Sequence, residues 1–120
     1  MPTTSSNFDL IKTGLDPNPR RTINATGYIR NGANDNEPRT LCPHVLGYKQ
    51  PGTPNETQPN ERVLCWQIAG PGTNPQWRCY RVADLVGVAI NVAVPWKMGT
   101  EYSKHQNCAK NEKFKVPYPP

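Results

Sequence analysis

The chain has 120 residues, a length that favours one domain with a modest core. Hydrophobic residues make up only 35% of it, and 14 prolines and 9 glycines interrupt it, which argues against long helices and favours short strands joined by loops. No run is long and apolar enough to span a bilayer, and residues 1–7 lack the features of a signal peptide. We therefore expect a cytoplasmic protein without a membrane partner, whose net charge of +5 favours an acidic partner.

Residues 1–19 are predicted to form a short helix and a linker. Apolar residues recur at helical spacing over 5–15, Ser6 or Asn7 would cap the helix, and it would end at Gly14 or shortly after. Prolines at 17 and 19 then make a stiff turn, because proline restricts its own φ and the residue before it. The apolar residues of this pattern are Phe8, Leu10, Ile11 and Leu15.

Residues 20–95 are predicted to form a β domain. Strand-forming residues occupy 21–30, where Gly27 indicates a bend, and polar turn residues over 31–38 predict a loop. A second strand is expected over 39–49, with Pro43 indicating an edge position or a break. Residues 50–60 contain three prolines and no large apolar side chain, so they are predicted to form a loop.

The apolar and aromatic residues concentrate in 61–90, which we interpret as the centre of the fold. Two runs of strand length, 63–69 and 77–82, flank a turn-rich segment that contains Gly72, and this pattern predicts a β-hairpin. Successive side chains of a strand point to opposite faces. Tyr80 and Val82 should therefore share one face with Arg78, and Trp77, Cys79 and Arg81 the other.

A tight turn over 83–85 leads into a β-branched run, 86–94, which would close a small barrel before Pro95 stops it. Residues 96–120 are polar and basic, end in prolines, and carry isolated aromatic residues without a steady period. We expect this C-terminal extension to be irregular and to wrap around the barrel. The predicted fold is thus mainly β, a small Sm/SH3-like β-barrel with a short N-terminal helix and an irregular C-terminal tail.

The four cysteines, Cys42, Cys65, Cys79 and Cys108, include no C-x-x-C pair, and we expect neither a metal site nor any other cofactor. Cys65 and Cys79 are predicted to lie on neighbouring strands. The simplest interpretation makes both of them small buried hydrophobic residues, and disulfides are the main alternative.

Three segments in the same order resemble the WYL domain family: R-T-L-C-P-H-V-L-G-Y from Arg39, R-V-L-C-W-Q-I-A-G from Arg62, and W-R-C-Y-R-V-A-D-L-V-G-V from Trp77. The strand at 64–68 keeps an aromatic residue but lacks the three signature letters of the family. The resemblance implies a barrel that binds a ligand, in a sensor or accessory module of bacterial or phage regulation and defence.

Arginines on strands match phosphate oxygens in two-point fashion, and the resemblance places basic ligand-contacting positions at Arg39, Arg78 and Arg81. His44 completes this predicted phosphate site. The alternative for each arginine is a solvent-facing charge. Aromatic residues beside basic groups can form stacking platforms for nucleobases. The alternative for each aromatic residue is packing in the core. The stacking candidates are Trp66, Trp77 and Tyr80.

The sequence singles out no catalytic residue. His44 and His105 together with Glu37, Glu61 or Glu101 could supply acid–base chemistry, but no spacing selects a pair. We therefore predict a binding module for nucleic acid or a nucleotide-like ligand, with a possible protein partner, and not an enzyme. The competing hypothesis is a secreted, disulfide-stapled effector or RNase-like toxin. The sequence leaves the oligomeric state open.

Overall fold

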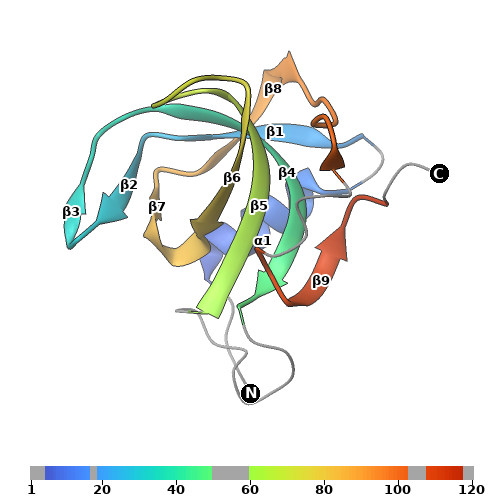
Figure 1. The fold of residues 1–120 in the computed structure, drawn as a ribbon, viewed down its shortest axis with the longest axis horizontal. Coiled ribbons are helices and arrows are strands. Elements are labelled where there is room, and N and C mark those ends of the chain that lie inside the picture. Colours follow the sequence, from blue (N-terminus) through green and yellow to red (C-terminus); the bar gives the residue numbers. More distant parts are fainter. Residues whose placement is uncertain (1–4, 17–18, 50–59, 103–107, 118–120) are drawn as a thin grey trace.

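The computed structural model describes residues 5–16, 19–49, 60–102 and 108–117. The loop expected over 50–60 lies outside these residues except for Asn60, whose carbonyl accepts a hydrogen bond from the Lys49 amide at 2.7 Å. Within the described residues the protein is mainly β, as predicted, with one α-helix ahead of the strands (Figure 1).

The elements, in chain order, are α1 (Ser6–Gly14), β1 (Arg21–Ala25), β2 (Gly27–Arg30), β3 (Ala33–Asn34), β4 (Arg39–Tyr48), β5 (Glu61–Ala69), β6 (Gln76–Arg81), the 3-10 turn η2 (Val82–Asp84), β7 (Leu85–Val86), β8 (Ala89–Pro95) and β9 (Asn111–Lys115).

The larger sheet has the order β6-β5-β4-β1-β8, and β9 also pairs with β4; all of these pairs are antiparallel. One side of β4 pairs with β5. Its other side pairs with β1 at residues 39–41 and with β9 at residues 45–48. β4 is therefore not an edge strand, although Pro43 lies between the stretches that pair with β1 and β9 and pairs only with Cys65 of β5. The predicted break at Pro43 is confirmed, because the register with β5 shifts between Pro43 and Val45.

The smaller sheet has the order β3-β2-β7 and continues two strands of the larger one after a bend (Figure 1). Thr26 separates β1 from β2, and its amide donates to the Val86 carbonyl at 2.7 Å. Gly87 separates β7 from β8 with φ +64°, and a Cβ there would lie 2.4 Å from Thr26 Oγ1. Only glycine fits this approach without strain, so the two strands bend together. Hydrogen bonds do not close the described strands into a barrel.

The segment predicted as a loop over 31–38 contains a short strand, β3, which forms a hairpin with β2. Asn31 and Gly32 form its turn with φ of 51° and 79°. An Asn-Gly pair with positive φ at both positions is the preferred two-residue hairpin turn. The predicted loop is wrong at residues 33–34, because the Asn-Gly turn pairs them with β2 despite the polar composition of the segment.

The hairpin of β5 and β6 is confirmed, with Leu64 opposite Cys79 and Trp66 opposite Trp77. The predicted alternation is also confirmed, since Tyr80 is buried and Cys79 is exposed. The turn after β6 is η2, at the place where the sequence predicts a tight turn.

Helix α1 is confirmed, but its cap is Ser5 and not Ser6 or Asn7. The Ser5 hydroxyl accepts from the Phe8 amide at 3.1 Å and donates to Glu61 of β5, while the Ser5 amide donates to the same carboxylate at 3.0 Å. Asn7 instead donates to two carbonyls around η2. Both ends of this first turn are thus tied to the β domain.

The core lies between α1 and the larger sheet. Phe8 stacks on Tyr48 with ring centroids 5.6 Å apart, and Ile11, Ile23 and Leu46 are fully buried. Such burial is the main source of stability for a chain of this size. The C-terminal extension is less irregular than predicted, because β9 adds to the sheet.

We expect Ser5→Ala to lower the free energy of unfolding by about 2 kcal/mol, since it removes the helix cap and a hydrogen bond to the buried Glu61 carboxylate. Ser6→Ala is the matched control, because Ser6 is exposed and adjacent to Ser5. Urea denaturation of the three proteins measures the difference. An equal loss from both variants would contradict the assignment of the cap.

Candidate functional site

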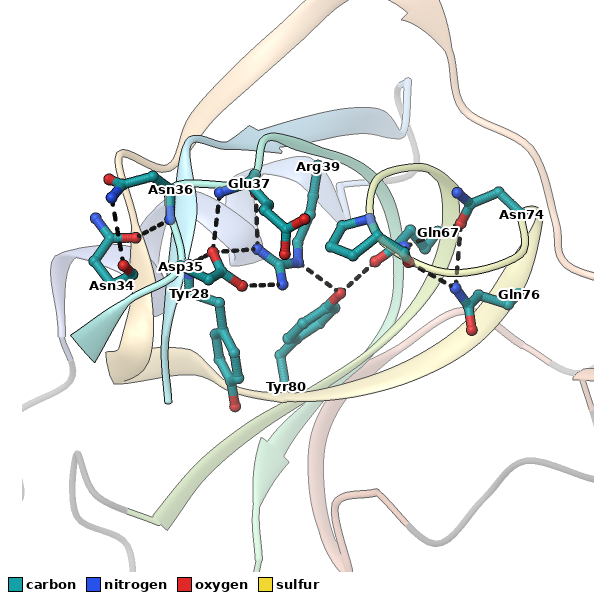
Figure 2. A network of polar contacts seen from close by, with 11 residues as sticks. Tyr28, Asn34, Asp35, Asn36, Glu37, Arg39, Gln67, Asn74, Gln76 and Tyr80 are labelled. Carbon is teal, nitrogen blue, oxygen red and sulfur yellow. Dashed lines mark hydrogen bonds and ion pairs between the residues drawn. The ribbon is translucent and has the colours of Figure 1, made fainter. Parts of the chain in front are cut away.

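Arg39, predicted as a ligand residue, is almost fully buried at the start of β4, with 2% of its surface exposed. Nη1 and Nη2 donate to Asp35 at 3.2 and 2.6 Å, Nη1 donates to the Glu37 carbonyl at 2.8 Å, and Nε donates to the Tyr80 hydroxyl at 3.0 Å (Figure 2). These partners occupy most of its donors. In this structure Arg39 is therefore a structural cation and not a free ligand contact.

The network around Arg39 extends to two loops. Asp35 also accepts from the Tyr28 and Glu37 amides, each at 3.0 Å. The hydrogen bond from Arg39 is the main reason that the pKa of the Asp35 carboxyl is held well below its usual range.

On the other side of Arg39, the Tyr80 hydroxyl donates to Gln67 Oε1. Gln67 Nε2 in turn donates to the Pro71 carbonyl at 2.9 Å and to Asn74 Oδ1 at 3.0 Å (Figure 2). The buried guanidinium thus joins the loop before β4 to the loop between β5 and β6.

Arginine and tyrosine side chains alternate around this network, and we call this group the arginine–tyrosine stack. The rings of Tyr28 and Tyr80 meet edge to face at 4.9 Å, and the Arg39 guanidinium lies 5.5 Å from each. Arg30 lies 5.7 Å from the Tyr28 ring, and Arg78 lies 5.8 Å from the Tyr80 ring. Arg30 is exposed and Arg78 half-buried, so these two arginines form the accessible part of the stack.

The structure therefore brings together three of the predicted residues, Arg39, Arg78 and Tyr80. Tyr80 is 1% exposed, so the prediction that it stacks on a base is wrong for this conformation. The sequence analysis missed Tyr28 and Arg30. Their spacing of two on a predicted strand places both on one face, and that signal would have found them.

Arg81, the remaining arginine candidate, is exposed on the other side of β6. Its Nε lies 3.3 Å from Asp84 Oδ2, and its amide donates to the Tyr28 hydroxyl at 3.0 Å. Arg62 lies directly opposite on β5, and its burial, together with the nearby charge of Arg81, lowers the pKa of Arg62. Arg81 thus lies outside the arginine–tyrosine stack.

The other three candidates, His44, Trp66 and Trp77, lie in an aromatic cluster together with Trp96 and Tyr102. The ring centroid of His44 is 4.7–4.9 Å from those of Trp77, Trp96 and Tyr102, and those of Trp66 and Trp77 are 5.0 Å apart.

The C-terminal extension covers the tryptophans of this aromatic cluster. A Cβ at Gly99 would lie 2.4 Å from the Trp77 ring and 2.7 Å from the Trp66 ring, and Trp77 Nε1 donates to the Thr100 carbonyl at 2.7 Å. Both tryptophans are half-buried beneath this segment, which favours the alternative of core packing for part of each ring; their stacking on a base stays a prediction.

His44 is fully buried and neutral. Nδ1 lies 2.8 Å from the Cys42 carbonyl, an acceptor, and Nε2 lies 3.1 Å from the Gly99 amide, a donor. The proton must therefore be on Nδ1, and a second proton would meet the Gly99 N–H. Burial lowers the pKa of His44 to about 4. With both nitrogens engaged, His44 is available neither as a phosphate ligand nor as a catalytic base.

The cysteines divide into two kinds. Cys65 is buried, as predicted, and burial raises the pKa of its thiol and of the Cys42 thiol. The interpretation of Cys79 as a buried hydrophobic residue is wrong, since Cys79 is exposed and forms a disulfide with Cys108. The disulfide ties the C-terminal extension to β6.

The part of the chain that the structure describes contains no group of three or more metal-ligating side chains. No helix among those residues is long and apolar enough to cross a membrane. Comparisons of the chain with protein-family models, with curated proteins and with solved structures found no match.

We expect acidification from pH 6.5 to 4 to lower the free energy of unfolding. The unfolded chain binds a proton at His44 near pH 6.5, whereas the folded protein binds it only near pH 4. The lost stability amounts to about 3 kcal/mol at most. Protonation of Glu61 raises the free energy of unfolding on acidification, because burial raises the pKa of its carboxyl in the folded protein.

His44→Phe isolates the histidine contribution. This variant is expected to be less stable at neutral pH, since it lacks the bond to Gly99, but to show a flatter pH dependence than the parent. Urea denaturation at a series of pH values compares the two slopes. Identical slopes would contradict a buried neutral histidine.

Proposed function

We propose that this protein is a binding module for a phosphate-bearing ligand, single-stranded nucleic acid or a nucleotide-like anion, and that the ligand binds at the arginine–tyrosine stack. The observation that carries the proposal is the placement of Arg30 and Arg78, two accessible cations held against tyrosine rings around buried Arg39. The carboxylate of this network, Asp35, already bonds Arg39. Guanidinium groups fixed in this way are suited to phosphate oxygens.

Charge rather than base stacking dominates the proposed recognition. Tyr80 is buried in the network, and Trp66 and Trp77 pack under the Gly99 segment. Tyr80 thus offers no ring face to a base, and the Gly99 segment covers part of both tryptophan rings. A ligand that is held through its phosphates alone binds with little preference for sequence and with a strong dependence on salt.

The relationship to the WYL domain family and the Sm/SH3-like barrel are parts of the same proposal. The bend of β2 and β7 supports the barrel, because it brings the Tyr28 hydroxyl within 3.0 Å of the Arg81 amide of β6. A module of this kind in bacterial or phage regulation or defence acts in the cytoplasm, through a protein partner or by sequestering its ligand. Binding without turnover agrees with the engaged state of both His44 nitrogens.

Arg78→Ala should weaken the binding of a labelled single-stranded oligonucleotide by about 1–3 kcal/mol, the scale of a lost charge-assisted hydrogen bond. Arg30→Ala should weaken the binding of the oligonucleotide by a similar amount. Arg81→Ala is the matched control on the same strand, because its side chain faces away from the stack and contacts Asp84. Fluorescence anisotropy measures the three affinities. An Arg78→Ala protein that binds as tightly as the parent would exclude the stack as the binding site.

The same titrations at several salt concentrations test the dominance of charge. Two or three phosphate contacts give a log–log slope of roughly −1.4 to −2.1 on a single strand. Trp77→Ala should affect stability more than affinity, since Trp77 packs inside the aromatic cluster. Affinity that does not change with salt would rule out recognition through phosphates.

The disulfide favours a second candidate, a secreted effector. Structural disulfides persist mainly in oxidising compartments, and Cys79–Cys108 ties the C-terminal extension to the sheet. Thiol titration of the denatured, unreduced protein should detect two thiols, Cys42 and Cys65. Four thiols in protein from its native source would exclude the disulfide and with it this candidate.

A further inference from the structure

A second basic pocket lies where β1 begins, far from the arginine–tyrosine stack. β1 and β2 run in succession, so Arg20 and Arg30 lie at opposite ends of this strand pair (Figure 1). The pocket has a volume of about 520 Å³, within the range of small-molecule sites. Its lining residues are Pro19, Arg20, Arg21, Asn91, Val92, Ala93, Val94, Pro95 and Trp96.

A bulge of β8 forms one wall of this pocket. Thr22 pairs with Asn91 whereas Arg21 pairs with Pro95, so residues 92–94 loop out of the ladder. The Thr22 hydroxyl lies 2.9 Å from the Asn91 carbonyl and 3.0 Å from the Val94 carbonyl, and Asn91 Oδ1 accepts from the Ala93 amide at 2.9 Å. The Thr22 contacts at the base of the bulge and the Asn91 contact within it hold the bulge in one conformation.

Trp96 fixes the position of Arg20. Its Nε1 donates to the Pro43 carbonyl at 3.1 Å, and its ring lies 4.7 Å from that of His44. The Arg20 guanidinium lies 5.4 Å from the Trp96 ring. The aromatic cluster thus supports this arginine.

Among the residues that the structure describes, the charge of Arg20 has no counterpart. Its Nε is buried without a hydrogen-bond partner, and no ion pair joins Arg20 or Arg21 to another described residue. No carboxylate lines the pocket. A half-buried guanidinium without a counter-charge is costly, and an anion bound at its terminal nitrogens would offset the cost of removing that charge from water.

We propose that this pocket binds the phosphate group of a small phosphomonoester. Arg20 and Arg21 both line the pocket, and their two positive charges match the charge of nearly −2 that a phosphomonoester carries at neutral pH. Val94, Pro95 and Trp96 also line the pocket, and their apolar side chains suit the organic part of such a molecule. A carboxylate, with one negative charge, neutralises only one of the two arginines.

Phenyl phosphate is the probe, with inorganic phosphate and benzoate as comparison ligands, in isothermal titration calorimetry at constant ionic strength. We expect phenyl phosphate to bind this pocket more tightly than either comparison ligand. Arg20→Gln and Arg21→Gln should each weaken it at least about tenfold, the effect of one lost charge-assisted contact. Arg30→Gln is the control and should leave this affinity unchanged.

The Arg20 Nε–H and Trp96 Nε1–H signals of the ¹H–¹⁵N spectrum provide a second measurement on the parent protein, so the test does not depend on the folding of a variant. Both signals should shift with phenyl phosphate and saturate at the calorimetric affinity. Unshifted signals, equal binding of phenyl phosphate and benzoate, or an Arg30→Gln effect as large as that of Arg20→Gln would each overturn the proposal. Oligonucleotide binding by Arg20→Gln should stay unchanged, which separates this pocket from the arginine–tyrosine stack.

Discussion

The buried charge of Arg39 is the constraint on which this end of the fold depends. A guanidinium removed from water is strongly destabilising unless its donors find partners. Asp35 and the Glu37 carbonyl, from the loop before β4, and the Tyr80 hydroxyl, from β6, supply them. Folding β4 into the centre of the sheet therefore requires the loop before it and the hairpin after it to take one arrangement.

The opposite side of the same hairpin depends on a neutral histidine. His44 joins a β4 carbonyl to the Gly99 amide, and three aromatic rings surround it. The Cys79–Cys108 disulfide holds the same extension further along the chain. Residues 99–102 and Cys108 of the tail are thus part of the packed structure, and Trp66 and Trp77 are half-buried beneath Gly99.

Besides the buried Arg39 and His44, the described residues include two accessible basic surfaces. The arginine–tyrosine stack presents Arg30 and Arg78, which aromatic rings keep in place. The pocket at the start of β1 presents Arg20 and Arg21 beside Trp96. In both places a ring orients a cation before any ligand arrives, which lowers the entropic cost of binding. The two surfaces lie at opposite ends of β1 and β2, so one ligand need not exclude the other.

The sequence alone determined the strand-rich class, helix α1, the hairpin of β5 and β6, and which side of β6 is buried. These features follow from local signals: the period of apolar residues, turn residues and the alternation of a strand. It also placed Arg39, Arg78 and Tyr80 among the candidate residues, because arginine and aromatic residues on predicted strands can be identified from the sequence.

Only the tertiary structure decided what those residues do. Arg39 and His44 became structural because the Tyr80 hydroxyl and the Gly99 amide, which lie far from them in the sequence, are among their partners. Ser5 replaced Ser6 as the cap because Glu61 of β5 accepts its hydrogen bonds. Cys79 pairs with Cys108 because β9 returns the chain to the sheet. Burial and partnership depend on segments that meet only after folding, and composition and spacing along the chain do not contain that information.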